Sequence, residues 1–546
     1  MKLEAETIDV SIQELEALVD RTLQELMDQE GHRKLRGAIA TLGEMARLLA
    51  DKETTLQQLR ELLLKSATTE KTRAVLGRTG MPAEPNQPES GEGKAEAGGK
   101  AEGGKKKKKK GHGRNPASAF PGARKVRVPH PTMKTGDRCP ECEKGKVYPL
   151  KDPAVRVRIV GQAPLQATVY ELERMRCNLC QEVFEAPAPE GVGEQKYDET
   201  SASMVAFLKY GNGFPFYRLE GLQENLGIPL PASTQWEMVE EAAESIATAH
   251  EELIRQAAQG KVLHNDDTTA RILQMQRETS PERTGVFTSG VVATAEGQKI
   301  ALFFTGDKHA GENLAEVLKQ RAAELPPPIQ MCDALSRNVP KPAPSMELLM
   351  ANCLTHGRRK FVEVAHNFPP ECRYVLETLG EVYGNDEAAR EQPMTAAERL
   401  AYHQTRSGPL MEGLRQWGEQ QLAEHKVEPN SGLGKAIQYL LKHWDKLTLF
   451  LKQEGAPLDN NICERALKKV ILHRKNALFY KTRNGARVGD LYMSLIHTCE
   501  LCGANPFDYL NELPRHATEL KRSPQEWMPW NYRATPGRTG AAAEAA

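Results

Sequence analysis

The stretch KVLHNDDTT, residues 261–269, decides how the central part of this chain folds. Its first half is apolar and its second half is acidic, as expected of a buried strand that delivers carboxylates at its end. Side chains alternate between the two faces of a strand, so Asp266 and Asp267 point to opposite sides if the strand continues. We therefore predict that Asp266 is the functional acid and that Asp267 supports the structure around it.

The residues that follow predict the rest of a sheet. Segments 285–294 and 299–305 are typical of two strands joined by a turn that contains glycine. A helical pattern over 310–323 leads to PIQMCDAL, residues 328–335, a short strand with Asp333 at its end. One more apolar segment follows. Three strands, a helix and two further strands indicate a mixed sheet of the ribonuclease-H type.

A third acid lies in PLDNNICERALKK, residues 457–469. Asp459 or an adjacent Asn can cap a helix there, and Glu464 precedes Lys468 by one turn, so that a carboxylate and an ammonium group share a face. Taken alone, the segment is typical of a surface helix with an ordinary ion pair. Together with the other two acids, it favours a metal ligand beside bound phosphates.

The three acids fit one kind of chemistry. Phosphodiester attack with two metal ions requires carboxylates that converge on ions about 3.5–4 Å apart. We assign Asp266, Asp333 and Glu464 as the catalytic and metal-binding residues, with two Mg²⁺ ions, or Mn²⁺, as the expected cofactors because carboxylates are hard oxygen ligands. Asp307 and Asp386 are weaker alternatives for the second acid.

The interval from Asp333 to Glu464 is too long for one strand and a connection. Its histidines, His403, His425 and His443, are expected at the surface or in the core rather than on a metal, because no cysteine or carboxylate accompanies them at ligand spacing. Four segments with helical patterns predict a mainly helical insertion: 368–383, 394–403, 407–425 and 432–454.

The first part of the chain carries a heptad pattern and then a basic segment. A seven-residue leucine repeat indicates helices that pair, either between chains or as a hairpin within one chain. The following Gly-, Pro- and Lys-rich segment has too few apolar side chains to fold. Its ten Lys/Arg against one acid over 101–130 can hold phosphates without sequence preference. The repeat consists of Leu35, Leu42, Leu49, Leu56 and Leu63.

Two CxxC pairs predict a structural zinc site. The four thiolates of Cys139, Cys142, Cys177 and Cys180 match the tetrahedral sulfur coordination that Zn²⁺ prefers. Strand-like alternation between the pairs favours a zinc ribbon with a long hairpin insertion. A redox role for the pairs is the alternative. Because protein fills all four positions, such an ion contributes to folding and not to chemistry.

A helical region lies between the ribbon and the sheet. Helical patterns over 216–226 and 232–246 flank the glycine-containing turn 227–231, an order compatible with a helix-turn-helix that reads DNA. The alternative is an ordinary helical hairpin with an apolar core of Leu219, Leu222, Leu226 and Trp236.

Composition and charge exclude several classes of protein. The formal net charge of the 546 residues is zero, and neither a signal peptide nor a run of about eighteen apolar residues is present. Ten cysteines in a chain of this length are not a disulfide scaffold. We expect a cytoplasmic, nucleoid-associated protein without a membrane partner.

This order of features resembles the transposases of the insertion sequence 66 family. The most specific matches are CLTHGRRKF, residues 353–361, and DNNICERA, residues 459–466, followed by HRKN, residues 473–476. The resemblance implies a DDE transposase with its acids at Asp266, Asp333 and Glu464. It also implies double-stranded DNA partners, namely the element ends and the target. Accessory proteins of the element are further partners that it allows.

Two local sequences depart from the family pattern. The family more often has Asp-Glu-Thr where this chain has Asp266-Asp267-Thr268, and Asp333 lies in MCDALS rather than the usual Asp-Gly-Tyr setting. Either His356 positions phosphate or water, or it makes a structural hydrogen bond. The residues expected to bind DNA are Lys105, Lys106, Lys107, Lys108, Lys109, Lys110, Arg114, Arg358, Arg359, Lys360, Lys468, Arg474 and Lys475.

The sequence as a whole predicts a multidomain α+β protein. The expected function is cleavage and transfer of DNA strands at the ends of a mobile element. The alternatives are a catalytically inactive DNA-binding regulator derived from a transposase and a hydrolytic nuclease without strand transfer. The expected regions are leucine-zipper helices at 1–78, a disordered basic linker at 79–128, a zinc ribbon at 129–190, a helical segment at 191–258, a ribonuclease-H-like catalytic domain at 259–364 and 457–521, its helical insertion at 365–456, and a disordered tail at 522–546.

Overall fold

The computed structural model describes most of the chain after residue 194 and shorter pieces before it. The heptad region, the basic linker with Lys105 to Lys110 and Arg114, and the four paired cysteines lie outside the described residues. The chain divides into two compact units, and the large sheet belongs to the unit that includes the residues from Leu165 onward. The described ranges are 132, 134–138, 140, 144–148, 162–176, 183–190, 195–277, 285–295, 297–341, 346–392 and 394–534.

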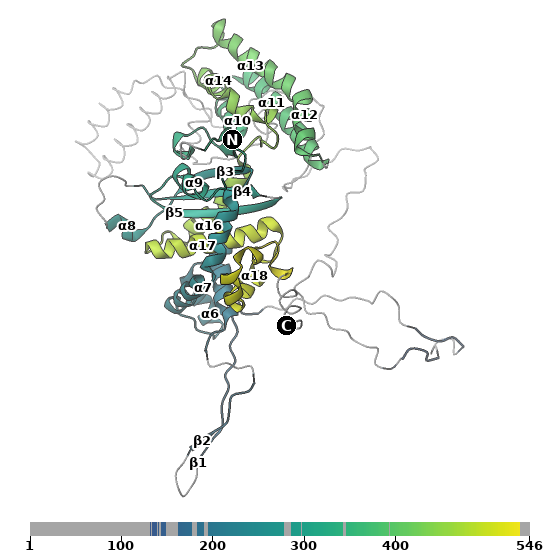
Figure 1. The fold of residues 1–546 in the computed structure, drawn as a ribbon, viewed down its shortest axis with the longest axis vertical. Helices are drawn as coiled ribbons and strands as arrows, with labels where there is room; N and C mark the ends of the chain where they lie inside the picture. Colours follow the sequence, from purple (N-terminus) through teal and green to yellow (C-terminus); the bar gives the residue numbers. More distant parts are fainter. Residues whose placement is uncertain are drawn as a thin grey trace, which may run out of the picture. The chain divides into compact units, whose positions relative to one another are not determined.

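A five-stranded mixed sheet forms the centre of the larger unit (Figure 1). The strand order is β5-β4-β3-β6-β7. The first three strands along the chain pair antiparallel, whereas β6 and β7 are parallel to β3. Helix α9 (Ala310–Leu318) connects β5 to β6, so the predicted order of strands and helix is observed. The strands are β3 (Val262–Thr269), β4 (Phe287–Ala295), β5 (Gln298–Gly306), β6 (Ile329–Cys332) and β7 (Leu349–Asn352).

Helix α17 (Arg483–Cys502) covers the edge strand β5. The side-chain oxygens of Thr498 and Ser494 accept hydrogen bonds from the backbone N–H groups of Ala301 and Phe303, each at 3.0 Å. These contacts satisfy edge donors that would otherwise be free to pair with another strand. The sheet edge is thus closed by hydroxyl groups of a helix.

Helix α16 (Asn461–Ala477) packs against β3 and β4. The close approach depends on Gly290 in β4, where a Cβ would lie 3.1 Å from the side chain of Leu467. Cys463 also donates its thiol to the carbonyl of Gly290 at 3.4 Å. This packing fixes the helix that carries Glu464 over the centre of the sheet.

The segment before the sheet is helical, as predicted. It contains α5 (Glu199–Ala206), a π-helical turn (Phe207–Gly211), α6 (Phe216–Asn225) and α7 (Ala232–Ala258). Gly227 has a φ of 76°, so the turn between α6 and α7 uses the conformation that glycine favours. Of the expected apolar core, Leu219 is buried, whereas Leu222 and Leu226 are 37% and 48% exposed.

The long interval between Asp333 and Glu464 is helical and has a separate hydrophobic core. Figure 1 shows α11 to α14 gathered together. Helices follow one another through the described part of this interval. Its helices, with the one that leads into it, are α10 (Leu354–Val364), α11 (Pro369–Glu391), α12 (Ala396–Arg406), α13 (Gly408–Ala423), α14 (Gly432–Lys442) and α15 (Trp444–Leu447).

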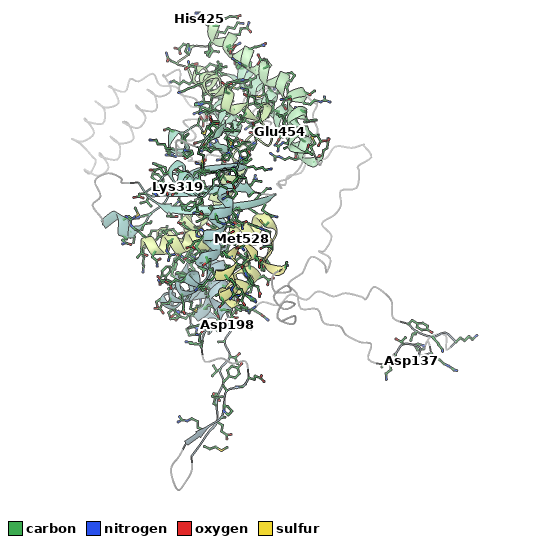
Figure 2. The ribbon with its side chains drawn as sticks, in the orientation of Figure 1. Asp137, Asp198, Lys319, His425, Glu454 and Met528 are labelled. Atoms are coloured by element: carbon green, nitrogen blue, oxygen red, sulfur yellow. The ribbon has the colours of Figure 1, made fainter. Side chains whose placement is uncertain are left out.

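The expectation of a disordered tail from residue 522 is wrong for its first part. Helices α18 (Pro506–Arg515) and α19 (Ala517–Arg522) lead into short turns whose side chains Trp527, Met528 and Tyr532 are buried. Tyr509 donates its hydroxyl to the carbonyl of Trp527 at 2.8 Å, and Figure 2 labels Met528 within the body of the molecule. The apolar side chains of this segment complete the main core.

Two short antiparallel pairings are described near the CxxC pairs in the sequence. Strands β1 (Arg174–Arg176) and β2 (Val183–Glu185) pair with each other, and Cys177 and Cys180 fall between them in the sequence. A bridge joins Arg138 to Lys146, and the other CxxC pair falls between these two residues in the sequence. No helix among the residues that the structure describes is both long and apolar enough to cross a membrane.

Candidate active site

Asp266 and Asp333 lie side by side at one end of the sheet. Strands β3 and β6 are parallel neighbours with Val262 opposite Ile329, and continuing this register by four residues brings Asp266 level with Asp333. The side-chain nitrogen of Asn338 donates to Oδ1 of Asp266 at 3.0 Å and to Oδ1 of Asp333 at 2.6 Å. One amide group therefore joins the first two predicted acids.

The environment of Asp266 disfavours its charged form. Burial raises the pKa of Asp266 to about 6, and the nearby Asp333 carboxylate adds to this effect. Hydrogen bonds from the Asp267 backbone N–H, at 2.8 Å, and from Asn338 act in the opposite direction. A cation at this place would relieve the repulsion between the two carboxylates.

A buried amide network holds Asn338 in place. Its backbone carbonyl accepts hydrogen bonds from the side chains of Asn265 in β3, at 2.7 Å, and Gln330 in β6, at 2.8 Å. The Gln330 amide also donates to the side-chain oxygen of Asn265 at 2.7 Å. All three residues are fully buried. Sequence reasoning missed this network, because nothing local to Asn338 shows that its loop folds back onto the two strands.

Asn460 connects the helix of Glu464 to the strand of Asp266. Its side-chain oxygen pairs with Nδ1 of His264 at 3.1 Å, and its side-chain nitrogen donates to the carbonyl of Asn265 at 3.1 Å. The expected capping role belongs to Asp459, whose carboxylate accepts from the backbone N–H of Asn461 at 3.0 Å. Asn460 stands at the N-cap position but makes no side-chain cap; it makes these tertiary contacts instead.

Glu464 faces His356 without a hydrogen bond. Nδ1 of His356 and Oε1 of Glu464 are 3.8 Å apart, beyond hydrogen-bonding distance. Both atoms are buried and neither has a hydrogen-bond partner. Cys353, one turn before His356, offers a thiol, and the ligand atoms of the three residues all lie within 4.8 Å of one another. One ion or water between these two atoms would satisfy both of them.

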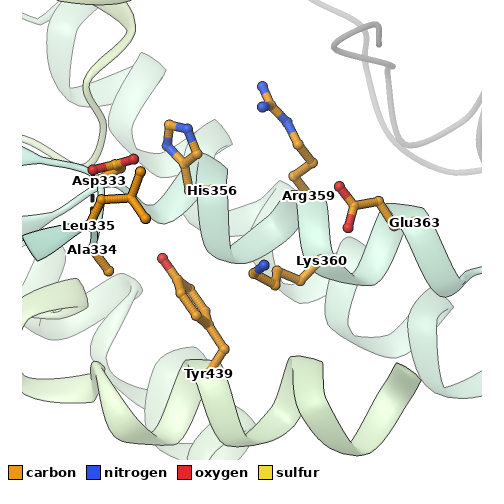
Figure 3. A pocket seen from close by; sticks show the side chains of 8 residues that line it. All are labelled: Asp333, Ala334, Leu335, His356, Arg359, Lys360, Glu363 and Tyr439. Atoms are coloured by element: carbon orange, nitrogen blue, oxygen red, sulfur yellow. Dashed lines mark hydrogen bonds between the residues drawn. The ribbon is translucent and has the colours of Figure 1, made fainter. Parts of the chain in front are cut away.

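A pocket of about 280 Å³ opens beside Asp333 and His356 (Figure 3). Asp333 and His356 form one side, and Arg359 and Lys360 from the same helix as His356 extend it. Tyr439 from α14 approaches from the helical insertion, with the Lys360 ammonium 5.2 Å from the centre of its ring. The pocket therefore combines acids for a cation with cations suited to phosphate.

Asp267 points away from this pocket, as alternation along β3 predicts. Its carboxylate pairs with Nδ1 of His309 at 2.8 Å and lies 3.3 Å from the guanidinium of Arg337. His309 precedes α9 and also packs on Phe287. These contacts give Asp267 partners of its own.

Asp386, the weaker candidate, lies inside the helical insertion. Its carboxylate pairs with Arg390, Arg399 and His403, and it is 1% exposed. His403 in turn contacts the hydroxyl of Ser407 at 3.1 Å. As expected, His403 is a core residue with partners. His425 is exposed beyond the end of α13 (Figure 2), and His443 packs on Tyr439.

The cations expected to bind DNA differ in their surroundings. Lys360, Lys468 and Lys475 are exposed, whereas Arg358 and Arg359 are partly buried. Burial lowers the pKa of Arg358. The guanidinium of Arg474 donates to the side chains of Thr268 and Thr269 at 3.1 and 2.8 Å, so it joins α16 to the end of β3.

Comparison with known proteins gives a family and several relatives. The sequence model described as "Transposase IS66 family" matches residues 195–488, more than half of the chain. Uncharacterized protein y4jD of Sinorhizobium fredii is 34% identical over 197 residues, which are 35% of this chain and 37% of that protein. Uncharacterized protein y4hP of the same organism is 25% identical over 387 residues, 67% of this chain and 68% of the relative.

A third relative, uncharacterized protein y4qI of Sinorhizobium fredii, is 28% identical over 193 residues. The match covers 34% of either chain. The chain thus spans only about a third of the length of y4jD and y4qI in these matches.

Proposed function

The chain belongs to the IS66 family of transposases, and from this premise we propose that it binds the ends of an insertion sequence and catalyses metal-dependent DNA cleavage and strand transfer. One observation carries the proposal. The carboxylates of Asp266 and Asp333 share one amide donor beside a pocket that is rich in cations. Acids that are brought together in this way at the end of a mixed sheet are what a ribonuclease-H-like nuclease requires.

The donor set fits divalent metal ions. Asp266, Asp333 and Glu464 would hold two Mg²⁺ ions, or Mn²⁺, because carboxylate oxygens are the ligands that these ions prefer. The unpartnered Oε1 of Glu464 and the raised pKa of Asp266 support this assignment. When bound, such ions activate the attacking hydroxyl and stabilise the leaving oxygen.

The residues around the acids have supporting roles in the proposal. Asn338 orients two carboxylates, and Asn460 keeps the helix of Glu464 against β3. Arg359 and Lys360 line the same pocket as Asp333 and would hold DNA phosphates, which fix the position of a strand without reading its bases. His356 would contact phosphate or an ion.

The remaining modules are assigned by their sequence. The heptad helices would join two copies of the chain, the basic segment would bind phosphates, and the cysteine pairs would hold a structural Zn²⁺. The paired helices α6 and α7 are one candidate for reading the element ends, and accessory proteins of the element are possible partners. A cytoplasmic, nucleoid-associated location accompanies this function.

The test is a cleavage and joining assay on DNA that carries the ends of the element. Wild-type protein should cut and join these ends only with Mg²⁺ or Mn²⁺, and Asp266→Ala should bind the DNA without cutting it. Cutting without joining would favour a hydrolytic nuclease. Binding without cutting by the wild type, with the accessory proteins of the element present, would favour the inactive regulator and overturn the proposal.

A further inference from the structure

We propose that Cys353, His356 and Glu464 form a binding site for one thiophilic divalent ion, with Zn²⁺ as the natural occupant. The site shares Glu464 with the proposed magnesium ligands, so this part of the inference rests on the proposed function. Binding of Zn²⁺ would withdraw Glu464 from the magnesium set and inhibit DNA cleavage. The site is distinct from the zinc ribbon, which uses other cysteines.

The geometry points to an ion rather than to a direct contact. Nδ1 of His356 and Oε1 of Glu464 lie 3.8 Å apart, and no hydrogen bond satisfies either buried atom. Ligand atoms around tetrahedral Zn²⁺ are roughly 3.4 Å apart, as follows from metal–ligand bonds of about 2.0–2.2 Å. The existing separation needs only a small closure. The sulfur of Cys353, one ring nitrogen of His356 and one carboxylate oxygen of Glu464 all lie within 4.8 Å of one another.

The donor types select a soft ion. Thiolate and imidazole favour Zn²⁺, whereas Mg²⁺ prefers oxygen ligands alone. Among the described residues, Cys353, His356 and Glu464 supply a sulfur, a nitrogen and an oxygen atom that are close enough to share one ion. Binding would replace the thiol proton of Cys353, which leaves to solvent, with a sulfur–metal bond.

A backbone hydrogen bond reaches the sulfur of Cys353. The backbone N–H of Asn460 donates to its sulfur at 3.3 Å, and such outer hydrogen bonds stabilise the charge on a ligand. Cys353 is fully buried at the start of α10, while His356, one turn later, reaches the pocket that also contains Asp333. An ion that enters the pocket can therefore reach the imidazole of His356 and the buried thiol of Cys353.

A cadmium titration of the full-length protein tests the site. Cd²⁺ bound to a thiolate gives an ultraviolet charge-transfer band, and the protein is first loaded with one equivalent of Zn²⁺ per chain, which the four thiolates of the ribbon take up. Wild type should bind one more Cd²⁺ per chain than Cys353→Ser, with this band. His356→Gln should bind the ion at least about tenfold more weakly, since the loss of even a supporting partner costs roughly 10–100-fold in metal affinity.

Cys502→Ser is the matched control because Cys502 is a free cysteine outside the cluster. It should titrate like wild type, and thermal unfolding confirms that each variant is folded. If Cys353→Ser does not fold, His356→Gln decides. Equal Cd²⁺ binding by wild type and folded His356→Gln, or by wild type and folded Cys353→Ser, would overturn the proposal and leave an ordered water as the occupant.

Zinc inhibition separates this inference from the proposed function. In Mg²⁺-dependent cleavage, the Zn²⁺ concentration for half inhibition, relative to the uninhibited rate of each protein, should be at least about tenfold lower in Cys502→Ser than in Cys353→Ser. Wild type that cleaves DNA but binds no additional thiolate-linked ion contradicts this site alone. Wild type that binds the ion but never cleaves DNA keeps the site and contradicts the proposed function.

Discussion

Two buried aspartates in this molecule have pKa values that are shifted in opposite directions by their surroundings. In the helical insertion, Asp386 is surrounded by two arginines and a histidine; burial acts against its charge, but the hydrogen bond from His403 and the charges of Arg399 and Arg390 lower its pKa. At the end of the sheet, burial raises the pKa of Asp266 to about 6, beside a second carboxylate.

The difference separates a structural cluster from a candidate functional one. The cations of the protein itself compensate the charge of Asp386, and the cluster joins α11 to α12. Asp266 instead accepts hydrogen bonds from an amide and a backbone N–H and lies beside a second carboxylate, and Oε1 of Glu464 has no hydrogen-bond partner. A bound cation would stabilise such a site, as the proposed metal centre requires.

The largest expected effect concerns catalysis at the second acid. Asp333→Asn should lower the rate of Mg²⁺-dependent DNA cleavage by about 10³-fold or more. The three acids would hold the metal ions as one unit, and the loss of one member of such a unit costs nearly as much as the loss of all. Asp386→Asn, compared per folded molecule, should keep the wild-type rate. Loss of cleavage in folded Asp386→Asn with full activity in Asp333→Asn would reverse the assignment of the second acid.

Asp386→Asn, which should leave activity unchanged, should lower the free energy of unfolding. Asp386→Asn should destabilise the protein by roughly 3–5 kcal/mol, because it leaves Arg390 and Arg399 without their buried partner. Urea unfolding of the variant and of wild type measures this difference. A variant as stable as wild type would mean that the cluster contributes nothing to holding α11 and α12.

Asp266→Asn should stabilise the metal-free protein at pH 7. The pKa of Asp266 in the folded state is about 2 above the usual value of an aspartate. The charged carboxylate therefore destabilises the folded state by at most roughly 3 kcal/mol. The folded wild type then binds more protons than the unfolded chain, so its stability should fall as pH rises from about 4 to about 6. Thermal unfolding in a chelator across this pH range checks the sign.

The Asp386 cluster has the opposite pH dependence. Because its folded-state pKa is lowered, its contribution is present above the ordinary pKa of an aspartate and is lost as the pH falls through the folded value. Comparing Asp386→Asn with wild type over the same range should show a difference that shrinks in acid. The same pH slope for both clusters would contradict the distinction between them.

The smallest effect is expected at Asn338. Asn338→Ala should raise the Mg²⁺ concentration for half-maximal cleavage about 10–100-fold, because the two carboxylates lose their common donor. Asn352→Ala is the control, since this buried amide donates to the backbone carbonyl of Asp333, at 3.3 Å, rather than to its carboxylate. Equal metal requirements in both variants would show that the Asn338 amide does not orient the acids.

Local patterns predict much of this fold. The apolar run that ends at Asp266 and the short strand before Asp333 predict two neighbouring strands, and the structure brings both acids to one end of the sheet. The helical patterns between Asp333 and Glu464 likewise predict helices in that interval. These features depend on residues that are close in the sequence.

Features that depend on distant contacts could not be predicted. Asn338 reaches the acids because its loop folds back on β3 and β6, and Asn460 uses its amide for β3 instead of for a helix cap. Trp527 is buried and stacks on His516, and the turn at 524–526 packs against α7, so the expectation of disorder from residue 522 is wrong there. The proximity of Cys353 and Glu464 likewise requires the folded structure.

The most direct test of the account compares two glutamates beside the same site. Glu464→Gln removes a proposed metal ligand, whereas Glu363→Gln changes an acid that lines the pocket but has no such role. With Mg²⁺ and DNA that carries the element ends, Glu464→Gln should bind the DNA and fail to cleave it, and Glu363→Gln should cleave like wild type. Full cleavage by Glu464→Gln would contradict the assignment of the three acids to one metal centre.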